Sequence, residues 1–452
     1  MVRNELFESP HIGRMFLRIA VPGSIGMLAS AIYQFIDGIF VNNFLGSAAF
    51  AAVNFSFPFL IAAYAVSDLF GVGSSVVLSL KLGQKKGEEA NHIFSATALI
   101  ILAANIIVAS LLLATIRPIL SAVGAQGEVK ELAFQYLLPA LCLLPLSGFF
   151  FSFDNFLRIS GKVKYSMSVN VVSSLFIIGI EYLLLGVLKV GIWGASLSSA
   201  MCFSVAALTS MVPFFAKKTI LTFAKPHIER RELSFLIRSG LPAFLANIAG
   251  RITSIVINAY LVKVGGNDAV SAYGSVLYID GFIYPLLYGM CDSLQPCLSY
   301  NHGAGRKDRV KKLQKYVFLV SFSFCFICFL LLCFMPNYLT YPFLSDGGEE
   351  LLKLGAQAGF FFSFLYIFRA IPYACSNLFQ AVGRPIPAVT ITLCLSLVFP
   401  MILLGCFIPL GLIGVWINAP VTYALGSILA GLLFYFLIVK DKHKEDILEE
   451  EK

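Results

Sequence analysis

Long apolar stretches separated by short polar segments run along the whole chain. About twelve of them reach the roughly 20 residues that a helix needs to cross about 30 Å of hydrocarbon. They are continuous and do not alternate with period two, so we expect helices, which satisfy their own backbone groups in lipid. The predicted spans cover residues 15–42, 49–80, 91–116, 131–153, 163–186, 191–215, 233–262, 270–300, 315–335, 351–379, 386–407 and 412–439.

The chain also repeats itself at an offset of about 220 residues, as expected for a fold built from two similar units. The stretch IAVPGSIGMLASAIYQFIDGIFV in the first half corresponds to SGLPAFLANIAGRITSIVINAYLV in the second. Internal repeats in a membrane chain indicate a transporter of two lobes, with the working site between or within them. Equivalent pairs at this offset are Pro22 and Pro242, Gly46 and Gly266, and Gly83 and Gly303.

The expected fold is therefore an all-α integral membrane protein of twelve transmembrane helices in two pseudo-symmetric six-helix lobes. Residues 1–215 form the first lobe, 216–232 a basic linker, 233–440 the second lobe, and 441–452 a charged tail. Six spans return the chain to the side where it started, so the two lobes have parallel topology, with their symmetry axis along the membrane normal.

The composition fits lipid as the main solvent, because 58% of the residues are hydrophobic and only 13% are charged. Most of the 33 lysines and arginines lie on one side of the span map, in both terminal segments, the linker and alternate loops, including Arg158 after the fourth span. The positive-inside rule then predicts a multi-pass plasma-membrane protein with both termini in the cytoplasm. The cations on the other side are Arg117, Lys130, Lys189, Lys263 and Lys353.

Several kinds of function are disfavoured. The net charge of +8 follows from this topology and requires no nucleic acid as a partner. We find no phosphate-binding loop and no nucleophile beside a base, so we expect neither an enzyme nor an ATP-driven pump. The ten cysteines lie in apolar spans, where packing explains them better than a metal, so no cofactor is expected. A non-transporting receptor or scaffold would not need two six-span repeats.

Ionisable residues inside the predicted spans are the candidates for function, because a charge at a helix centre is unfavourable by at least about 2.5–3.5 kcal/mol. Asp37 lies well down the first span, and Tyr33 stands one helical turn earlier on the same face. Asp37 could carry a proton or coordinate Na⁺, or it could be a structural or interfacial group. Glu181 in the fifth span is a similar candidate, unless it is half-solvated near the outer third.

Five more ionisable residues lie within spans. Asp68 and Asp292 either line a cavity or pair with Arg251 or Arg369, which would neutralise both charges. Asp280 is a weaker case of the same kind. We therefore treat Asp68, Asp292, Arg251 and Arg369 as candidates for a substrate cavity.

Specific motifs resemble those of the multidrug and toxic compound extrusion (MATE) family along essentially all of 14–440. YQFIDGIFVNNFLG resembles the family's Tyr-Asn-x-x-Asp-x-x-Phe/Trp-Val pattern, and GIWGASLSS its Gly-Val-x-Gly-Ala-Ala-x-Ala-Thr. QPCLSYNHGAGRKDRV and LFQAVGRPIPA are similar to the branch that includes the MepA-type and DinF-like bacterial exporters. The resemblance implies a V-shaped antiporter that exports organic cations in exchange for H⁺ or Na⁺.

The resemblance also assigns roles to residues. It places Asp37 on the family's first-helix aspartate, Tyr33 on the preceding tyrosine, and Gln34 where asparagine is usual. Glu181 replaces the fifth-helix aspartate, and Ser199 keeps the hydroxyl of a sixth-helix threonine. The family's remaining polar positions differ in this chain: Ile177 replaces an asparagine, and Gly250, Cys394 and Tyr423 replace a glutamate, an arginine and an acidic residue.

The expected function is thus an antiporter that exports small amphipathic, cationic compounds by alternating access. Asp37, Glu181, Tyr33 and Ser199 would couple the cation, and Gln34 and Gln295, the latter from the Gln-Pro motif, would join the cavity candidates. The partners would be the bilayer and a small organic substrate, with the protein acting as a monomer. The alternative is a flippase or exporter of a lipid-linked or other specific metabolite, whose pyrophosphate would need several basic residues in the cavity. The choice between H⁺ and Na⁺ stays open.

Overall fold

The computed structural model describes residues 4–122, 124–344 and 348–440, and its regular elements in these ranges are all helical. Ten of the described helices are long and apolar enough to cross a membrane, and a pair bent by 42° supplies one more span. The longest helix, α8, has 74 residues and would extend about 110 Å if straight. It breaks at Gly266, where φ is 65°, and so supplies two spans, which gives twelve.

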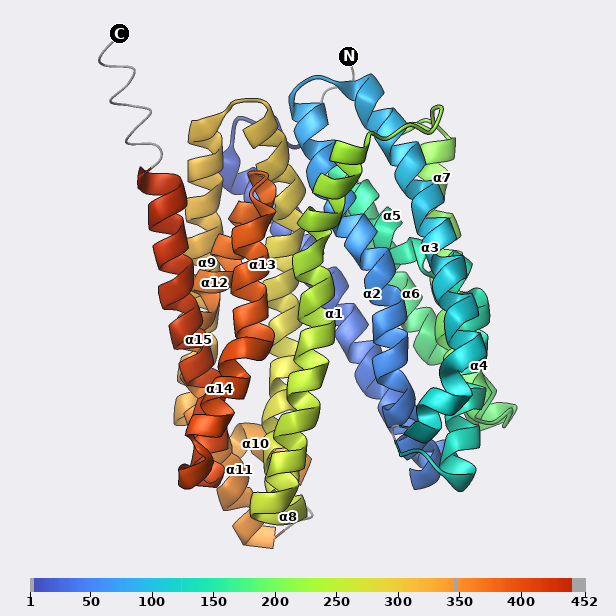
Figure 1. The fold of residues 1–452 in the computed structure, drawn as a ribbon, viewed down its shortest axis with the longest axis vertical. Coiled ribbons are helices and arrows are strands. Elements are labelled where there is room, and N and C mark those ends of the chain that lie inside the picture. Colours follow the sequence, from blue (N-terminus) through green and yellow to red (C-terminus); the bar gives the residue numbers. More distant parts are fainter. Residues whose placement is uncertain (1–3, 123, 345–347, 441–452) are drawn as a thin grey trace.

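The helices fall into two groups that form the two predicted lobes (Figure 1). In the N-lobe, two short interruptions stand out: α4 and α5 meet at Gly148, and α6 runs into a π-helical turn, η1. The N-lobe elements are α1 (Ile12–Leu45), α2 (Ser47–Gly83), α3 (Gly87–Ala122), α4 (Gly127–Ser147), α5 (Phe149–Ile159), α6 (Val163–Tyr182), η1 (Leu183–Val187) and α7 (Ile192–Phe215).

The C-lobe repeats this plan with more interruptions, because α11 and α12 form the bent span and a second π-helical turn, η3, divides α13 from α14. A short extra helix, α10, was not predicted. The C-lobe elements are α8 (Arg230–Gly303), α9 (Lys307–Phe334), α10 (Pro336–Leu344), α11 (Gly348–Ser363), α12 (Leu365–Ala381), α13 (Pro385–Leu393), η3 (Cys394–Val398), α14 (Phe399–Cys406), η4 (Ile408–Leu410), α15 (Leu412–Phe434) and η5 (Tyr435–Val439).

Both ends of the described chain lie at one end of the bundle, which we call the termini side, and the two lobes diverge toward the opposite far side (Figure 1). The buried apolar side chains follow this shape. One core cluster extends through both lobes, whereas a second is confined to the N-lobe and includes Val41, Ala49 and Leu120 near the far ends of their helices. The lobes therefore share a core on the termini side and separate beyond it.

The repeat glycines Gly83 and Gly303 meet each other's helices at this closed end. A Cβ on Gly83 would lie 2.1 Å from the carbonyl oxygen of Tyr300, and one on Gly303 would lie 2.3 Å from that of Leu80. The two contacts are equivalent under the 220-residue repeat, so α2 and the second half of α8 cross beside the pseudo-symmetry axis. Only a residue without a side chain permits this backbone contact.

Polar contacts reinforce the closure on the termini side. Lys81 of α2 pairs with Glu232 of α8 at 2.7 Å, which joins the lobes directly. The linker packs on α3, where the Ala224 amide donates to Ser95 Oγ at 2.8 Å. The linker also ends earlier than predicted, because Glu229 caps α8 and its amide donates to the Glu232 carboxylate at 3.2 Å. Residues 230–232 of the predicted linker are therefore the first turn of α8.

The fourth span also extends further than predicted. Its apolar run ends at 153, yet α5 continues to Ile159. The added turn contains Asp154 and Arg158, which are both buried and form an ion pair with one another. Polar residues continue a membrane helix when they satisfy each other inside the protein. The sequence pattern predicts Arg158 in a loop after the fourth span, whereas the structure buries it in α5.

We expect Gly303→Val to weaken the closed state, because the new side chain must push the two lobes apart. Overpacking of this kind destabilises proteins by about 1–3 kcal/mol. Unfolding in detergent with increasing SDS would measure the loss. Gly431→Val is the matched control, since a Cβ there meets nothing within 4 Å. Equal stability of the two variants would contradict the close approach.

Candidate functional site

Two buried carboxyl groups face each other inside the N-lobe. Asp37, on α1, is 5% exposed, and Glu181, in the last turn of α6, is fully buried. Their side chains lie within hydrogen-bonding reach. No donor among the described residues reaches either oxygen of Glu181, so the two share a hydrogen bond only when one carries a proton. Two adjacent buried carboxylates cannot both stay charged without a bound cation.

Tyrosines surround this carboxyl pair. Tyr33 lies one turn before Asp37, as predicted, and its ring packs edge-on against Phe203 of α7 at 5.9 Å. Tyr136 of α4 also lies close to both carboxyl groups, and Tyr64 of α2 lies close to Tyr33 and Tyr136. Sequence reasoning did not single out Tyr136, because its helix carries no local motif that connects it to α1. The π-helical turn η1 begins two residues after Glu181, and such turns often accompany functional sites.

The other two N-lobe candidates are less directly involved. Ser199 donates its hydroxyl to carbonyl groups of its own helix, at 3.2 Å to Ser196 and 3.4 Å to Ala195. Gln34 is exposed and lies within reach of the Tyr33 hydroxyl. The structure thus brings together Asp37, Glu181 and Tyr33, with Gln34 beside Tyr33, whereas the hydroxyl of Ser199 is bonded to its own helix.

A second buried cluster joins the two lobes through Arg158. This guanidinium, 2% exposed, lies 2.6 Å from Asp154 of its own helix and also pairs with Asp292 of α8. The other oxygen of Asp154 accepts hydrogen bonds from Ser166 at 2.5 Å and Asn170 at 2.7 Å. The prediction that Asp292 could pair with Arg251 or Arg369 is therefore wrong. The partner of Asp292 is Arg158, which the sequence pattern predicts in a loop but which lies in α5.

Asp68 of α2 lies next to this cluster. Its surroundings include Asp292, Arg158 and Asp154, and its half-buried carboxylate takes no hydrogen bond from a described residue. One arginine therefore faces three carboxylates. This part of the lobe interface has an excess of carboxyl groups over basic groups, which favours a bound proton or cation.

Arg369 belongs to a separate cluster within the C-lobe. Its guanidinium forms two parallel contacts with Asp280, one of them 2.9 Å long, and Tyr366 donates to the same carboxylate at 2.8 Å. Its other face lies over the rings of Tyr284 and Tyr423, at 5.2 and 5.3 Å. The predicted partnership with Asp68 or Asp292 is thus wrong here too. Arg251 is exposed on α8 and pairs with no carboxylate in the described ranges.

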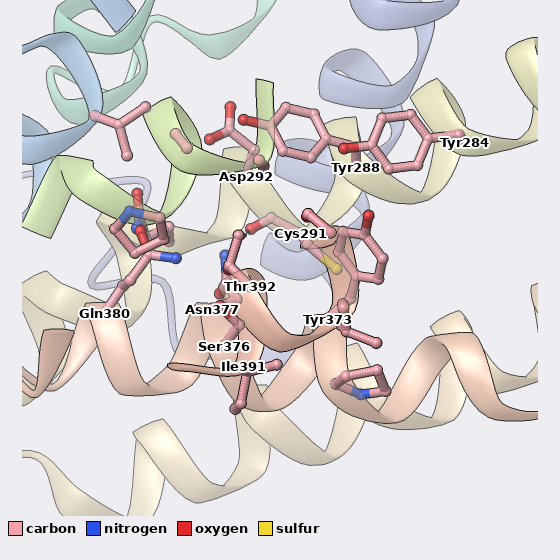
Figure 2. A pocket seen from close by; sticks show the side chains of 18 of the residues that line it. Tyr284, Tyr288, Cys291, Asp292, Tyr373, Ser376, Asn377, Gln380, Ile391 and Thr392 are labelled. Carbon is pink, nitrogen blue, oxygen red and sulfur yellow. Dashed lines mark hydrogen bonds between the residues drawn. The ribbon is translucent and has the colours of Figure 1, made fainter. Parts of the chain in front are cut away.

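A cavity lies between the two halves of α8 and the helices α12, α13 and α15 (Figure 2). Tyr284, Tyr288 and Asp292 form one wall, and Asn377 and Gln380 another. Val72 of α2 reaches it from the N-lobe, so the cavity borders the lobe interface. Of the predicted cavity residues, it includes Asp292 and Gln295. Arg369 does not line the cavity, because the rings of Tyr284 and Tyr423 lie between its guanidinium and the cavity.

The fold and these buried polar sites define a multi-span membrane protein of two repeated lobes. The sequence model of the MatE family matches residues 22–183 and 242–405, two segments that begin at the repeat prolines. The chain therefore belongs to the MatE family, as the resemblance predicted. It is a membrane transporter and not an enzyme.

Named relatives cover nearly the whole chain. The multidrug export protein MepA of Staphylococcus aureus (strain MSSA476) is 24% identical over 435 residues, 95% of each protein. MepA of Staphylococcus haemolyticus (strain JCSC1435) is 27% identical over 325 residues, 71% of each. These names describe the relatives, and their identity to this chain is low.

Solved structures share the fold. A MATE transporter in complex with MaL6 has a TM-score of 0.91 at 22% identity, over 97% of this chain and 99% of that one. An outward-facing multidrug resistance MATE transporter also reaches 0.91, at 21% identity, over 97% and 98%. A transporter from Pyrococcus furiosus, described as having a binding pocket of reverse polarity, reaches 0.89 at 22% identity, over 95% and 96%. The expected all-α, two-lobed fold is confirmed.

Proposed function

We propose that the protein is a secondary active exporter of small amphipathic, cationic organic compounds, driven by exchange for H⁺ or Na⁺. The buried carboxyl pair of Asp37 and Glu181 carries the proposal, because the pair requires a proton or a cation to be stable. The MepA relatives, named as multidrug export proteins, support the direction and the breadth of transport.

Coupling would follow from the position of the pair on α1 and α6. α1 also packs against α8, where Ser24 donates to the Leu286 carbonyl at 2.8 Å. Neutralising the pair would let the two helices approach, and losing the ion would drive them apart. A change at the pair could thus reach the lobe interface through α1 as a rigid element. Ser199 and Gln34 would supply further oxygens if the ion is Na⁺.

We further propose that both termini face the cytoplasm of a plasma membrane and that the monomer is the transporting unit. The excess of basic residues on the termini side supports this orientation. With that orientation, the lobes are closed toward the cytoplasm and diverge toward the outside, which is the arrangement that releases substrate outward.

The alternative function, a flippase for a lipid-linked precursor, would need free basic groups near the cavity. Arg158 and Arg369 are both engaged by carboxylates. Among Arg158, Arg251 and Arg369, only Arg251 has no carboxylate partner in the described ranges, and carboxyl groups outnumber basic groups around Arg158. These observations favour a cationic substrate over a pyrophosphate.

Ethidium efflux from proteoliposomes tests the proposal. We expect export that is driven by an imposed H⁺ gradient or an imposed Na⁺ gradient, applied separately, and that stops when the gradient is collapsed. Empty liposomes give the background. Absence of efflux under both gradients, with protein shown to be folded, would move the assignment to a narrow substrate or to the flippase.

A further inference from the structure

The cavity has buried hydrogen-bond acceptors without donors. Asn377 donates its amide to the Cys291 carbonyl at 2.7 Å. Because a carbonyl only accepts, this contact fixes the amide orientation and leaves Asn377 Oδ1 without a donor among the described residues. Gln295 donates to Gln380 at 3.0 Å, and its own Oε1 is likewise unpartnered. The two residues are 7% and 2% exposed, so bulk water does not cover them.

The same cavity has a carboxylate at its edge. Asp292 gives one oxygen, Oδ2, to Arg158, and its Oδ1 takes no hydrogen bond in the described part of the chain. Asp68 and Asp154 lie near, so a single guanidinium balances three carboxylates. The cavity therefore offers a carboxylate oxygen and two unpartnered amide oxygens together. A ligand that brings both positive charge and N–H groups would satisfy them.

We propose that this cavity binds organic cations that carry N–H groups, such as primary ammonium, amidinium or guanidinium compounds, and that the bound cation competes with Arg158 for Asp292. The proposal rests on the exporter function proposed above and names its substrate contacts. Asp292 takes the charge, and the oxygens of Gln295 and Asn377 accept the N–H groups.

The competition connects occupancy to lobe closure. Arg158 belongs to the N-lobe and Asp292 to the C-lobe, so their ion pair is a direct tie between the lobes. A cation that takes Asp292 leaves Arg158 paired with Asp154 on its own helix. Binding therefore weakens the ion pair between the lobes, while the guanidinium of Arg158 stays compensated by Asp154. The bound cation thus favours separation of the lobes on the termini side.

The decisive measurement compares two benzyl cations of the same charge, one with three N–H groups and one in which methyl groups replace all three hydrogens. Benzylammonium and benzyltrimethylammonium are titrated into the full-length protein in detergent by isothermal calorimetry. We expect benzylammonium to bind at least tenfold more tightly, because charged N–H groups replace missing hydrogen bonds. Equal affinities, or tighter binding of the trimethyl compound, would overturn the proposal without any variant.

Two variants should act in opposite directions. Asp292→Asn should weaken benzylammonium binding at least tenfold, whereas Arg158→Gln should tighten it, because the ligand no longer competes for Asp292. A purely structural ion pair would make both variants bind more weakly, and that result contradicts the competition. Asn377→Leu should reduce the preference for benzylammonium over the trimethyl compound. Glu8→Gln is the matched control, since it breaks an ion pair with Arg306 outside the cavity.

The outcomes separate this inference from the proposed function. Gradient-driven ethidium efflux together with equal binding of the two cations overturns the cavity assignment and leaves the exporter standing. Tight, N–H-dependent binding without any ethidium efflux supports the cavity and overturns the proposed multidrug efflux.

Discussion

Replacing Asp37 with asparagine is expected to abolish ion-coupled efflux while the protein still folds. Asp37 and Glu181 are buried side by side, and the pair holds a proton or cation because two adjacent buried carboxylates cannot both stay charged. The amide keeps the size of the side chain but has no charge to exchange. Ethidium efflux from proteoliposomes under separate H⁺ and Na⁺ gradients should fall to the level of empty liposomes.

Folding of Asp37→Asn should be intact, because the variant removes one of two adjacent buried acids. We expect a thermal unfolding midpoint in detergent no lower than that of the wild type. Glu131→Gln is the matched control, since this carboxylate is exposed and only 3.6 Å from the equally exposed Arg117. The control should transport normally. Coupled efflux that persists in Asp37→Asn would reject the carboxyl pair as the coupling site.

Removing one partner of the Asp280–Arg369 pair is expected to have the largest effect on stability. Arg369→Leu leaves the carboxylate of Asp280, which is 15% exposed, without its guanidinium. Breaking a buried pair in this way destabilises proteins by about 3–5 kcal/mol. SDS-induced unfolding in detergent would measure the loss, with helix content followed by circular dichroism.

The double variant Asp280→Asn with Arg369→Leu separates charge from packing. It removes both charges, so it should be clearly more stable than Arg369→Leu alone. Lys353→Leu is the control for an exposed pair, since its partner Glu349 lies at 2.7 Å on the surface of α11, and exposed pairs contribute at most about 1 kcal/mol. If Arg369→Leu costs no more than Lys353→Leu, the cluster does not stabilise the C-lobe.

Much of the fold was predictable because the lipid environment restricts the choice. A continuous apolar run has to become a helix there, and the spans were identified on that ground. The pairs Gly46 and Gly266, and Gly83 and Gly303, were visible as a repeat before their roles were known. Both members of the first pair adopt positive φ, and the second pair forms the lobe crossing.

The polar sites were harder to predict, because their members lie far apart in the chain. Asp37 and Glu181 could be selected as buried acids, but their contact depends on how α1 packs against α6. Arg158 was placed in a loop because the apolar run ended before it. Its burial depends on Asp292, which lies more than a hundred residues further along.

The sequence alone thus determines where the helices lie, that the two halves repeat, and which acids lie inside the spans. These features follow from local composition and spacing, because the chemistry of each residue decides whether it favours lipid or water. Pairing does not follow in this way. A buried charge takes whichever partner the packing of the two lobes brings near, so Asp292 meets Arg158 and Arg369 meets Asp280. The unpartnered oxygens of Gln295 and Asn377 likewise exist only because α8 and α12 enclose them together.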